Sequence, residues 1–495
     1  MFDVVEQGRQ LSKAEYKQQE EHFRTELLKL QRDLADANIA TLIMICGVEG
    51  SGKGDVVDNL NKWFDSRGME THAFWDETDE ETQRPEYWRY WKRLPARGSI
   101  ATMFGGWYWD PIYDRAEDKL DEAAFKKHAQ RIIEFERMLV EDGLLIIKLW
   151  FHLSKKVFKQ RIAQRSTASY HIATSLSTED TNKHYKKFTT SAGDLLSYTN
   201  TPESPWMLIE SDDVYSRNAE VAHALLRRIS QRLNAPEDLG NPRSPEFKLN
   251  DRSEPVLAKV DLNVCLDNAL YKKELKSLQR ELAALSWQAY DQKRSTVIVF
   301  EGWDAAGKGG AIRRITRAMD ARLYRGISVG APSDEELAHH YLWRFWRQIP
   351  RAGYITLYDR SWYGRVLVER VEGLASDLEW QRAYQEINDF ETQLFDHGVV
   401  LIKFWLHISP EEQLRRFEHR QTTPWKQHKL TDEDRRNREK WQDYTDAVND
   451  MLLQTNTKNA PWHVIPANDK YFARVDVLRV VTQHMAKMLE RFPAH

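Results

Sequence analysis

An internal repeat is the feature that most constrains the fold of this 495-residue chain, because blocks of its first half recur 255 positions later. GVEGSGKGD from Gly47 matches GWDAAGKGG from Gly302, and RYWKRLPARGSI from Arg89 matches RFWRQIPRAGYI from Arg344. DGLLIIKLWFHLS and HGVVLIKFWLHIS keep the same offset, and near the two ends SPWMLI and APWHVI align with one residue more. Several blocks in register over this length indicate a duplicated domain.

A polar stretch rich in proline, from Leu233 to Pro255, separates the two copies and is typical of a linker. We therefore predict one domain over residues 1–245 and a second over 246–495. Within each copy, strand-like runs such as VIVF, YITLY, VVLIKFWLHI and WHVI alternate with long helical patterns. This alternation predicts an α/β fold with a parallel sheet flanked by helices, which binds ligands at the carboxyl ends of its strands.

Charge, hydropathy and cysteine content exclude several classes of protein. The formal net charge of −3 argues against a general nucleic-acid binder, which usually carries a basic surplus. No apolar run approaches the ~20 residues that span a bilayer, and the polar start does not fit a signal peptide, so we expect no membrane partner and a cytoplasmic location. The two cysteines, Cys46 and Cys265, have no motif partners, which predicts buried free thiols.

The segment GWDAAGKGG has the glycine and lysine spacing of a phosphate-binding loop. The apolar run STVIVFEG precedes it, and the segment Ala311–Leu323 after it has helical spacing, so the expected strand, turn and helix are all present. Loop glycines let backbone N–H groups approach phosphate oxygens, and the lysine adds a full positive charge. The predicted phosphate-binding residues of the loop are Gly302, Gly307, Lys308, Gly309 and Gly310.

Gly309 stands where a serine or threonine normally holds magnesium in such a loop. Two carboxylates could replace that hydroxyl: Asp304 inside the loop and Asp359 directly after the predicted strand YITLY. Magnesium prefers oxygen ligands and keeps several waters. We therefore predict that Asp304 and Asp359 hold Mg²⁺ and that the neighbouring Arg360 stabilises the transferring group.

The first copy lacks the charged pair Asp359–Arg360, while the pair Trp362–Tyr363 persists there as Trp107–Tyr108, which favours a packing role for the latter pair. The replacements are Glu49 for Asp304, Phe104 for Asp359 and Gly105 for Arg360. Loss of the charges with retention of the packing residues predicts a catalytically silent first copy.

Further cations surround the second loop and suit phosphoryl transfer, since arginine is planar, permanently charged and bidentate. The segment Arg415–Lys429 follows a strand and is predicted to be a mobile lid that closes over phosphates. The predicted phosphate contacts beyond the loop are Arg313, Arg365, Arg420, Lys426 and Lys429.

At these residues the chain resembles the polyphosphate kinase 2 family, whose motifs read G-x-D-x-x-G-K-G and D-R-S-W-Y. Gly302 to Gly309 match the first motif and Asp359 to Tyr363 the second, in a duplicated arrangement like that of the fused members. The resemblance implies two tandem phosphate-loop kinase domains with helical lids. It also implies phosphoryl transfer from inorganic polyphosphate to AMP, giving ADP, with Asp304, Lys308, Asp359 and Arg360 as catalytic residues. Ser361 and Tyr363 of the second motif are then expected in the substrate site.

The residues alone leave two other interpretations of the function open. An ATP-dependent kinase of a nucleoside or small hydroxyl compound would keep the same loop but would need a base near its acceptor. A nucleotide sensor without catalysis would fit the first copy taken by itself. The preferred nucleotide acceptor and a homo-oligomeric state are likewise left open by the sequence.

Overall fold

The computed structural model describes residues 2–165, 178–235, 255–424 and 438–491, and the predicted boundary near residue 245 lies outside them. The chain forms two compact units. The first contains Met1–Glu77, Arg89–Pro242 and Asp334–His340. The second contains Thr78–Trp88, Arg243–Ser333 and Tyr341–His495, so each unit includes a short segment from the other half of the sequence.

The first unit is built on a parallel sheet of five strands in the order β2-β3-β1-β4-β5. Its strands are β1 (Thr41–Gly47), β2 (Met69–Ala73), β3 (Ile100–Phe104), β4 (Leu145–His152) and β5 (Trp206–Glu210). The second unit repeats this topology in the order β10-β9-β6-β8-β7. Its strands are β6 (Thr296–Gly302), β7 (Tyr324–Ser328), β8 (Ile355–Asp359), β9 (Val400–His407) and β10 (Trp462–Pro466).

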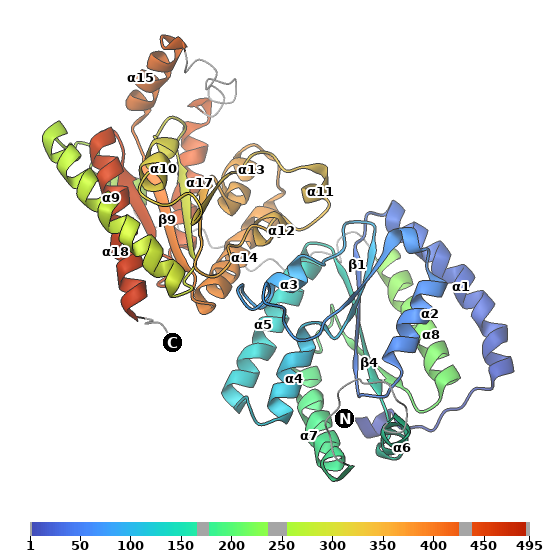
Figure 1. Cartoon of the computed structure of the whole chain (residues 1–495). Helices are drawn as coiled ribbons and strands as arrows, with labels where there is room; N and C mark the ends of the chain where they lie inside the picture. The colour runs from blue at the N-terminus through green and yellow to red at the C-terminus, as the bar shows by residue number, and fades with distance from the viewer. Residues whose placement is uncertain (1, 166–177, 236–254, 425–437, 492–495) are drawn as a thin grey trace. The chain divides into compact units, whose positions relative to one another are not determined.

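Helices cover both faces of each sheet (Figure 1). In the first unit α1, α2 and α8 form one layer and α4, α5 and α7 the other. The helices of the first copy are α1 (Lys13–Asp36), α2 (Lys53–Trp63), α3 (Trp88–Trp91), α4 (Trp109–Ala116), α5 (Glu122–Glu141), α6 (Lys155–Arg165), α7 (Thr178–Tyr198) and α8 (Val214–Leu233), with short 3₁₀ turns η1 (Phe2–Val4), η2 (Ser66–Gly68) and η3 (Gly106–Tyr108).

In the second unit α9, α10 and α18 pack together on one face, while α13, α14 and α17 pack on the other (Figure 1). The helices of the second copy are α9 (Asn268–Asp291), α10 (Lys308–Thr316), α11 (Asp334–Leu337), α12 (Trp343–Trp346), α13 (Val368–Val371), α14 (Asp377–Asp396), α15 (Pro410–Gln421), α17 (Trp441–Gln454) and α18 (Lys470–Arg491), with 3₁₀ turns η5 (Val256–Lys259) and η6 (Trp362–Val366).

The apolar runs of the sequence account for the sheets. Every residue of β1, β4 and β9 is buried, as is β6 except at Gly302, and these strands are mostly apolar because helices cover both faces of a parallel sheet. Local signals begin the helices: Ser376 and Glu379 form a capping box at the start of α14. The α/β prediction with parallel sheets is confirmed in both copies.

The structure differs from the sequence-based expectation in three places. The helix expected over Ala311–Leu323 ends at Thr316, and a local turn follows in which Asp320 accepts a hydrogen bond from the backbone N–H of Arg322. The edge strands β2 and β7 carry no apolar run and were not predicted. Cys46 is buried as expected, but Cys265 is exposed because it lies in the irregular segment before α9.

No helix among the described residues is long and apolar enough to cross a bilayer.

Candidate phosphate-loop site

The loop between β6 and α10 forms the strand, turn and helix expected of a phosphate-binding loop. Gly302 ends β6 with φ of 146°, and a Cβ atom there would lie 2.6 Å from the carbonyl oxygen of Leu406, so only glycine fits. Gly307 adopts a left-handed conformation as the N-cap of α10. The first N–H groups of this nine-residue helix therefore face the loop, which is the arrangement that binds anions.

Lys308, the first residue of α10, folds back over the loop. Its Nζ donates hydrogen bonds to the carbonyl oxygens of Gly302 at 2.5 Å and Trp303 at 3.3 Å. The first copy has the same arrangement, since Lys53 Nζ donates to the carbonyl oxygens of Gly47 at 2.6 Å and Val48 at 3.0 Å. The lysine thus makes the same backbone hydrogen bonds in both loops.

Asp359 lies near Gly309, the residue that lacks the usual hydroxyl side chain. It ends β8, which pairs with β6, and its Oδ2 atom lies 4.0 Å from where a Cβ atom of Gly309 would be. A serine at position 309 would therefore place its hydroxyl beside this carboxylate. Arg360, the next residue, brings its Nη2 atom to 3.3 Å from Asp304 Oδ1. The structure thus brings Asp304, Asp359 and Arg360 together around the loop.

The donor set suits magnesium by its chemistry, because it offers two carboxylates beside the N–H groups of a phosphate-binding loop. The described residues contain no group of three or more histidine, cysteine, aspartate or glutamate side chains that could hold a metal. A cation held by Asp304 and Asp359 would complete its shell with water and phosphate oxygens, as Mg²⁺ does.

Arg416 anchors the loop and was not recognised in the sequence. It is almost completely buried in α15 and donates to the carbonyl oxygens of Ala305, Ala306, Ala467 and Asn468 at 2.6–3.0 Å. Its counterpart Arg161 does the same in the first copy. An arginine shared by both copies and saturated by carbonyl groups shapes the loop in each of them.

A buried polar network lies beneath the second motif. Trp362 and Tyr363 both donate to Glu391 Oε1, at 3.1 and 2.6 Å, while Lys403 Nζ lies 2.7 Å from Glu391 Oε2. Lys403 is fully buried, and burial lowers the pKa of its ammonium group while Glu391 opposes that shift. Thr455 accepts a further bond from Lys403 through its carbonyl oxygen.

The substrate contact expected for Tyr363 needs correction, because its side chain is fully buried and its hydroxyl is bonded to Glu391 and Lys403. The packing role predicted for the Trp362–Tyr363 pair is confirmed. The same network exists in the first copy, where Trp107, Tyr108, Glu136 and Lys148 take these places.

Ser361 and Arg365 likewise have internal partners where substrate contacts were expected. The Ser361 hydroxyl donates to the buried carboxylate of Glu301 at 2.7 Å, and Arg365 lies 3.2 Å from Glu369 and over the ring of Tyr341. Glu301 was missed in the sequence. Its position opposite Cys46 in the first copy is the signal that could have identified it.

Arginines of α10 extend the positive charge beyond the loop. Arg313 and Arg317 are exposed and line, with Tyr271 and Tyr324, a hollow between α9 and β7. Arg314 Nη1 donates to the carbonyl oxygen of Gly310, beside Arg474 of α18. Lys470 at the start of α18 has its pKa lowered to about 8 by burial and by nearby arginines, Arg416 first among them.

The predicted lid is described only in part. Its first residues belong to α15, where the Arg420 guanidinium lies 5.7 Å from the ring centre of Phe417. Lys426 and Lys429 lie outside the described residues. Figure 1 shows α15 extending beyond the sheet of the second unit.

The first copy has the loop without its charged surroundings. Phe104 ends β3 in the place of Asp359, and Lys53 Nζ lies 5.8 Å from the centre of its ring. Gly105 has φ of 91° where the second copy has Arg360. At Gly106, opposite Ser361, the sulfur of Met44 occupies the space, lying 2.6 Å from a Cβ position.

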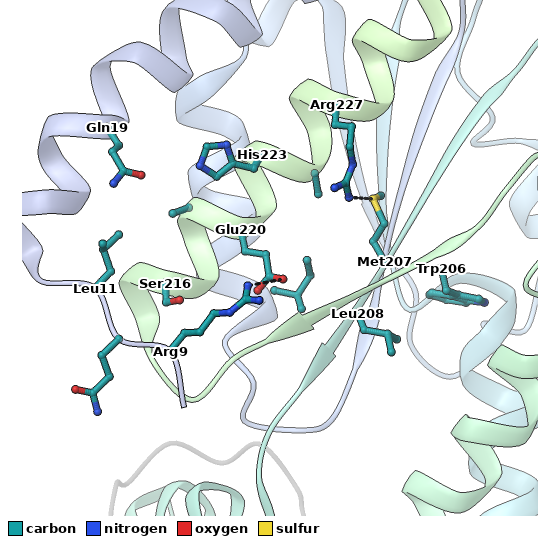
Figure 2. A pocket seen from close by; sticks show the side chains of 14 residues that line it. Arg9, Leu11, Gln19, Trp206, Met207, Leu208, Ser216, Glu220, His223 and Arg227 are labelled. Carbon is teal, nitrogen blue, oxygen red and sulfur yellow. Dashed lines mark hydrogen bonds and ion pairs between the residues drawn. The ribbon is translucent and has the colours of Figure 1, made fainter. Parts of the chain in front are cut away.

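A separate pocket of the first unit lies between the N-terminal segment, α8 and the edge strand β5 (Figure 2). Arg9 and Glu220 face each other across it at 3.8 Å, and Met207 and His223 contribute to its wall. None of its lining residues belongs to the loop that follows β1, so this pocket is distinct from the phosphate-loop site.

Fold and site together define a pair of phosphate-loop kinase domains, of which only the second combines the loop with two carboxylates and a facing arginine. The sequence matches the polyphosphate kinase 2 family over residues 10–236 and 265–493, and the chain belongs to that family.

Its relatives include the polyphosphate:AMP phosphotransferase of Pseudomonas aeruginosa, 42% identical over 97% of this chain and 98% of the relative. The enzyme of the same name from Pseudomonas syringae pv. tomato is 41% identical over 99% of both chains. A crystal structure from Pseudomonas aeruginosa PA01, described as a polyphosphate kinase 2, superposes with a TM-score of 0.89. It is 40% identical and covers 99% of this chain and all of that one.

Proposed function

We propose that this chain transfers the terminal phosphoryl group of inorganic polyphosphate to AMP, giving ADP, with the help of Mg²⁺. The full-length relatives named polyphosphate:AMP phosphotransferase support this choice of donor and acceptor. The observation that carries the proposal is the position of Asp359 beside Gly309 of the loop, with the next residue, Arg360, bonded to Asp304; the first copy has Phe104 and Gly105 at these positions. Since AMP and its adenylate products are cytoplasmic metabolites, we also propose a cytoplasmic location.

The second copy supplies the catalytic residues of this proposal. Asp304 and Asp359 would hold the metal, which when bound neutralises phosphate oxygens. Lys308 would turn from the loop carbonyl groups toward the donor phosphate, and Arg360 would stabilise the charge on the transferring group. The glycines and the start of α10 bind phosphate oxygens through backbone N–H groups.

The acceptor chemistry needs no strong base. An oxygen of the AMP phosphate attacks the terminal phosphorus, the bridging P–O bond breaks, and polyphosphate shortened by one unit leaves with the electron pair. The AMP phosphate is already largely ionised at neutral pH, so no proton has to be removed before attack. The main task of the protein is to reduce the repulsion between two anions, for which cations are suited.

The polyphosphate chain would follow the positive charge around α10. None of these cations is kept in the first copy. Arg313 aligns there with Asp58, which has the opposite charge, and Arg314 and Lys470 align with the uncharged Asn59 and Val214. Arg474 likewise aligns with Asn218. The lid residues Arg420, Lys426 and Lys429 are proposed to close over the phosphates from the other side.

The proposal assigns different roles to the two copies, with a boundary near residue 245. The second copy catalyses, and the first serves as a scaffold or a weak anion site, because its loop faces Phe104 instead of a carboxylate.

The test is an assay of the purified full-length chain with long-chain polyphosphate and AMP in the absence of ATP, followed by chromatography of the nucleotides. ADP formation that requires Mg²⁺ is expected. Parallel reactions with ADP or GMP as acceptor measure acceptor preference. If the chain transferred no phosphoryl group from polyphosphate but phosphorylated a nucleoside with ATP, it would be an ATP-dependent kinase and this proposal would be wrong.

A further inference from the structure

Glu301 and Ser361 connect the two strand ends that form the site. Glu301 precedes Gly302 in β6, and Ser361 follows Arg360 after β8. Both are almost completely buried, at 5% and 3% exposure, and the serine hydroxyl donates to Glu301 Oε1 at 2.7 Å. The same hydroxyl oxygen accepts from the backbone N–H of Tyr363 at 3.3 Å, so it also begins the turn η6.

The backbone between Asp359 and Ser361 is in an unfavourable conformation. Arg360 has φ of 65°, in the left-handed region that a residue with a side chain occupies at a cost of about 1–3 kcal/mol. Such a conformation persists only where neighbouring contacts hold it. Here the Arg360 N–H donates to Phe300, and the bond from Ser361 to Glu301 secures the other side of the same turn.

The first copy turns at the equivalent positions without this pair and with a different backbone, since Gly106 has φ of 58° where Ser361 has φ of −156°. Four positions differ together between the copies: Cys46, Phe104, Gly105 and Gly106 take the places of Glu301, Asp359, Arg360 and Ser361. Glycines at 105 and 106 adopt positive φ without the penalty, and the Met44 sulfur lies 2.6 Å from where a Cβ atom of Gly106 would be. The network around Glu136 and Lys148 is nevertheless kept. The fold therefore does not require a carboxylate at the position of Glu301.

A buried carboxylate is expensive, which points to a role beyond folding. Burial raises the pKa of Glu301, while the Ser361 hydrogen bond and the charges of Lys308 and Arg360 favour its ionised form and Asp359 opposes it. The charged groups that face Glu301 are thus those assigned to catalysis.

We infer that Glu301 is a positioning residue for phosphoryl transfer, which acts through the Ser361 hydroxyl to hold Asp359 and Arg360 in the orientation that faces the loop. This inference rests on the proposed function only in that its rate measurement uses polyphosphate and AMP as substrates. Neither residue touches the reacting atoms. Without the hydrogen bond, the turn can relax to negative φ at Arg360, and the carboxylate and the guanidinium then move away from the loop.

The decisive comparison is Ser361→Thr against Ser361→Val in the full-length chain. The two side chains have the same shape, so any steric cost is shared, and only threonine keeps the hydroxyl. We expect Ser361→Val to turn over at least ~10-fold more slowly than Ser361→Thr, mainly through kcat, with KM for both substrates within about threefold. Glu301→Met, which removes the acceptor of this hydrogen bond, should give a similar loss with an unchanged or raised melting temperature, since it replaces a buried carboxyl group by an apolar side chain.

A double-mutant cycle tests whether the two residues act as one unit. Ser361→Val combined with Glu301→Met should turn over within about threefold of the slower single variant. Cys46→Ala, at the equivalent position of the first copy, is the matched control and should leave turnover unchanged. The inference would be wrong if the loss of turnover in the double variant equalled the product of the two single losses. It would also be wrong if Ser361→Thr and Ser361→Val had equal rates.

A second measurement needs no substrate and separates this inference from the proposed function. The affinity for Mn²⁺ is measured by electron paramagnetic resonance, with Asp359→Asn as the reference for loss of the site. The affinity should be lower by about threefold or more in Ser361→Val than in Ser361→Thr. If the chain used another donor, the proposed function would fail while this difference would remain. Equal Mn²⁺ affinity in the two variants would contradict the inference whatever the donor is.

Discussion

Replacing the loop lysine in each copy separates catalysis from folding within one molecule. Lys308 and Lys53 begin equivalent helices and donate to equivalent loop carbonyl groups, at 2.5 and 3.3 Å in the second copy and at 2.6 and 3.0 Å in the first. Lys308→Ala and Lys53→Ala therefore remove equivalent hydrogen bonds, although Lys53 also lies 5.8 Å from the ring centre of Phe104. Their effects on stability should be similar, and their effects on turnover should not.

The contacts give the size of each effect. Two hydrogen bonds of this kind are worth roughly 0.5–1.5 kcal/mol each in net stability, so both variants should unfold a few degrees below the parent. In catalysis, one preorganised cation at the transferring phosphate contributes about 2.7–4 kcal/mol, which corresponds to a loss of 10²–10³ in kcat. We expect this loss for Lys308→Ala and a change within about threefold for Lys53→Ala.

The assay compares the initial rates of ADP formation from polyphosphate and AMP, with the melting temperature of each variant measured in the same buffer. Equal losses of rate in the two variants would show that both copies catalyse. The absence of Asp359 and Arg360 equivalents in the first copy would then be compensated by other residues, and our assignment of roles to the copies would be wrong.

Other expectations follow from the same site. Asp359→Asn should lower turnover at least ~10²-fold with little change in melting temperature, and a near-normal rate would remove the carboxylate from the mechanism. Polyphosphate binding, measured by titration at several salt concentrations, should weaken steeply with salt, and Arg420→Ala should reduce the slope; an unchanged slope would place that side chain outside the binding track. Burial lowers the pKa of Lys470 to about 8, so its positive charge is lost as pH rises through 8 and the affinity for polyphosphate should fall there. Lys470→Arg should abolish this fall in affinity, and an identical fall in that variant would assign it to another group. Glu391→Gln and Glu136→Gln should each lower the free energy of unfolding of their unit by about 3–5 kcal/mol, because each leaves a buried lysine poorly paired. Only Glu391→Gln should change kcat. Calorimetry tests the first statement and the rate assay the second.

The sheets and the loop could be predicted because their signals are local. The apolar runs of β6 and β9 are long enough to specify buried strands, and the loop spacing with Lys308 specifies a phosphate site. The edge strand β7 reads YRGIS and alternates in burial without an apolar run, so nothing in its own residues distinguishes it from a loop. Its pairing with β8 provides the missing information.

The internal partners of the motif residues could not be predicted, because they are separated by long stretches of chain. Tyr363 meets Glu391 and Lys403 only after α14 and β9 have packed against η6. Arg416 reaches the loop carbonyl groups across more than a hundred residues of sequence. A motif gives the identity of its side chains but not their direction, and this is why Tyr363 was expected in the substrate site although it is buried beneath it.

The two copies together show which polar groups belong to the fold and which to the chemistry. A buried lysine paired with glutamate occurs in both, at Lys148 and Lys403, each completely enclosed and each bonded to a tyrosine of the same motif. Because this network persists where the catalytic charges are absent, its role is to join the sheet to the turn after its third strand. The carboxylate of Glu301 is equally buried but is absent from the first copy, where the turn forms with glycine instead. A buried carboxyl group that the same fold can omit must be explained by its neighbours, and Glu301 bonds to Ser361, the residue after Arg360.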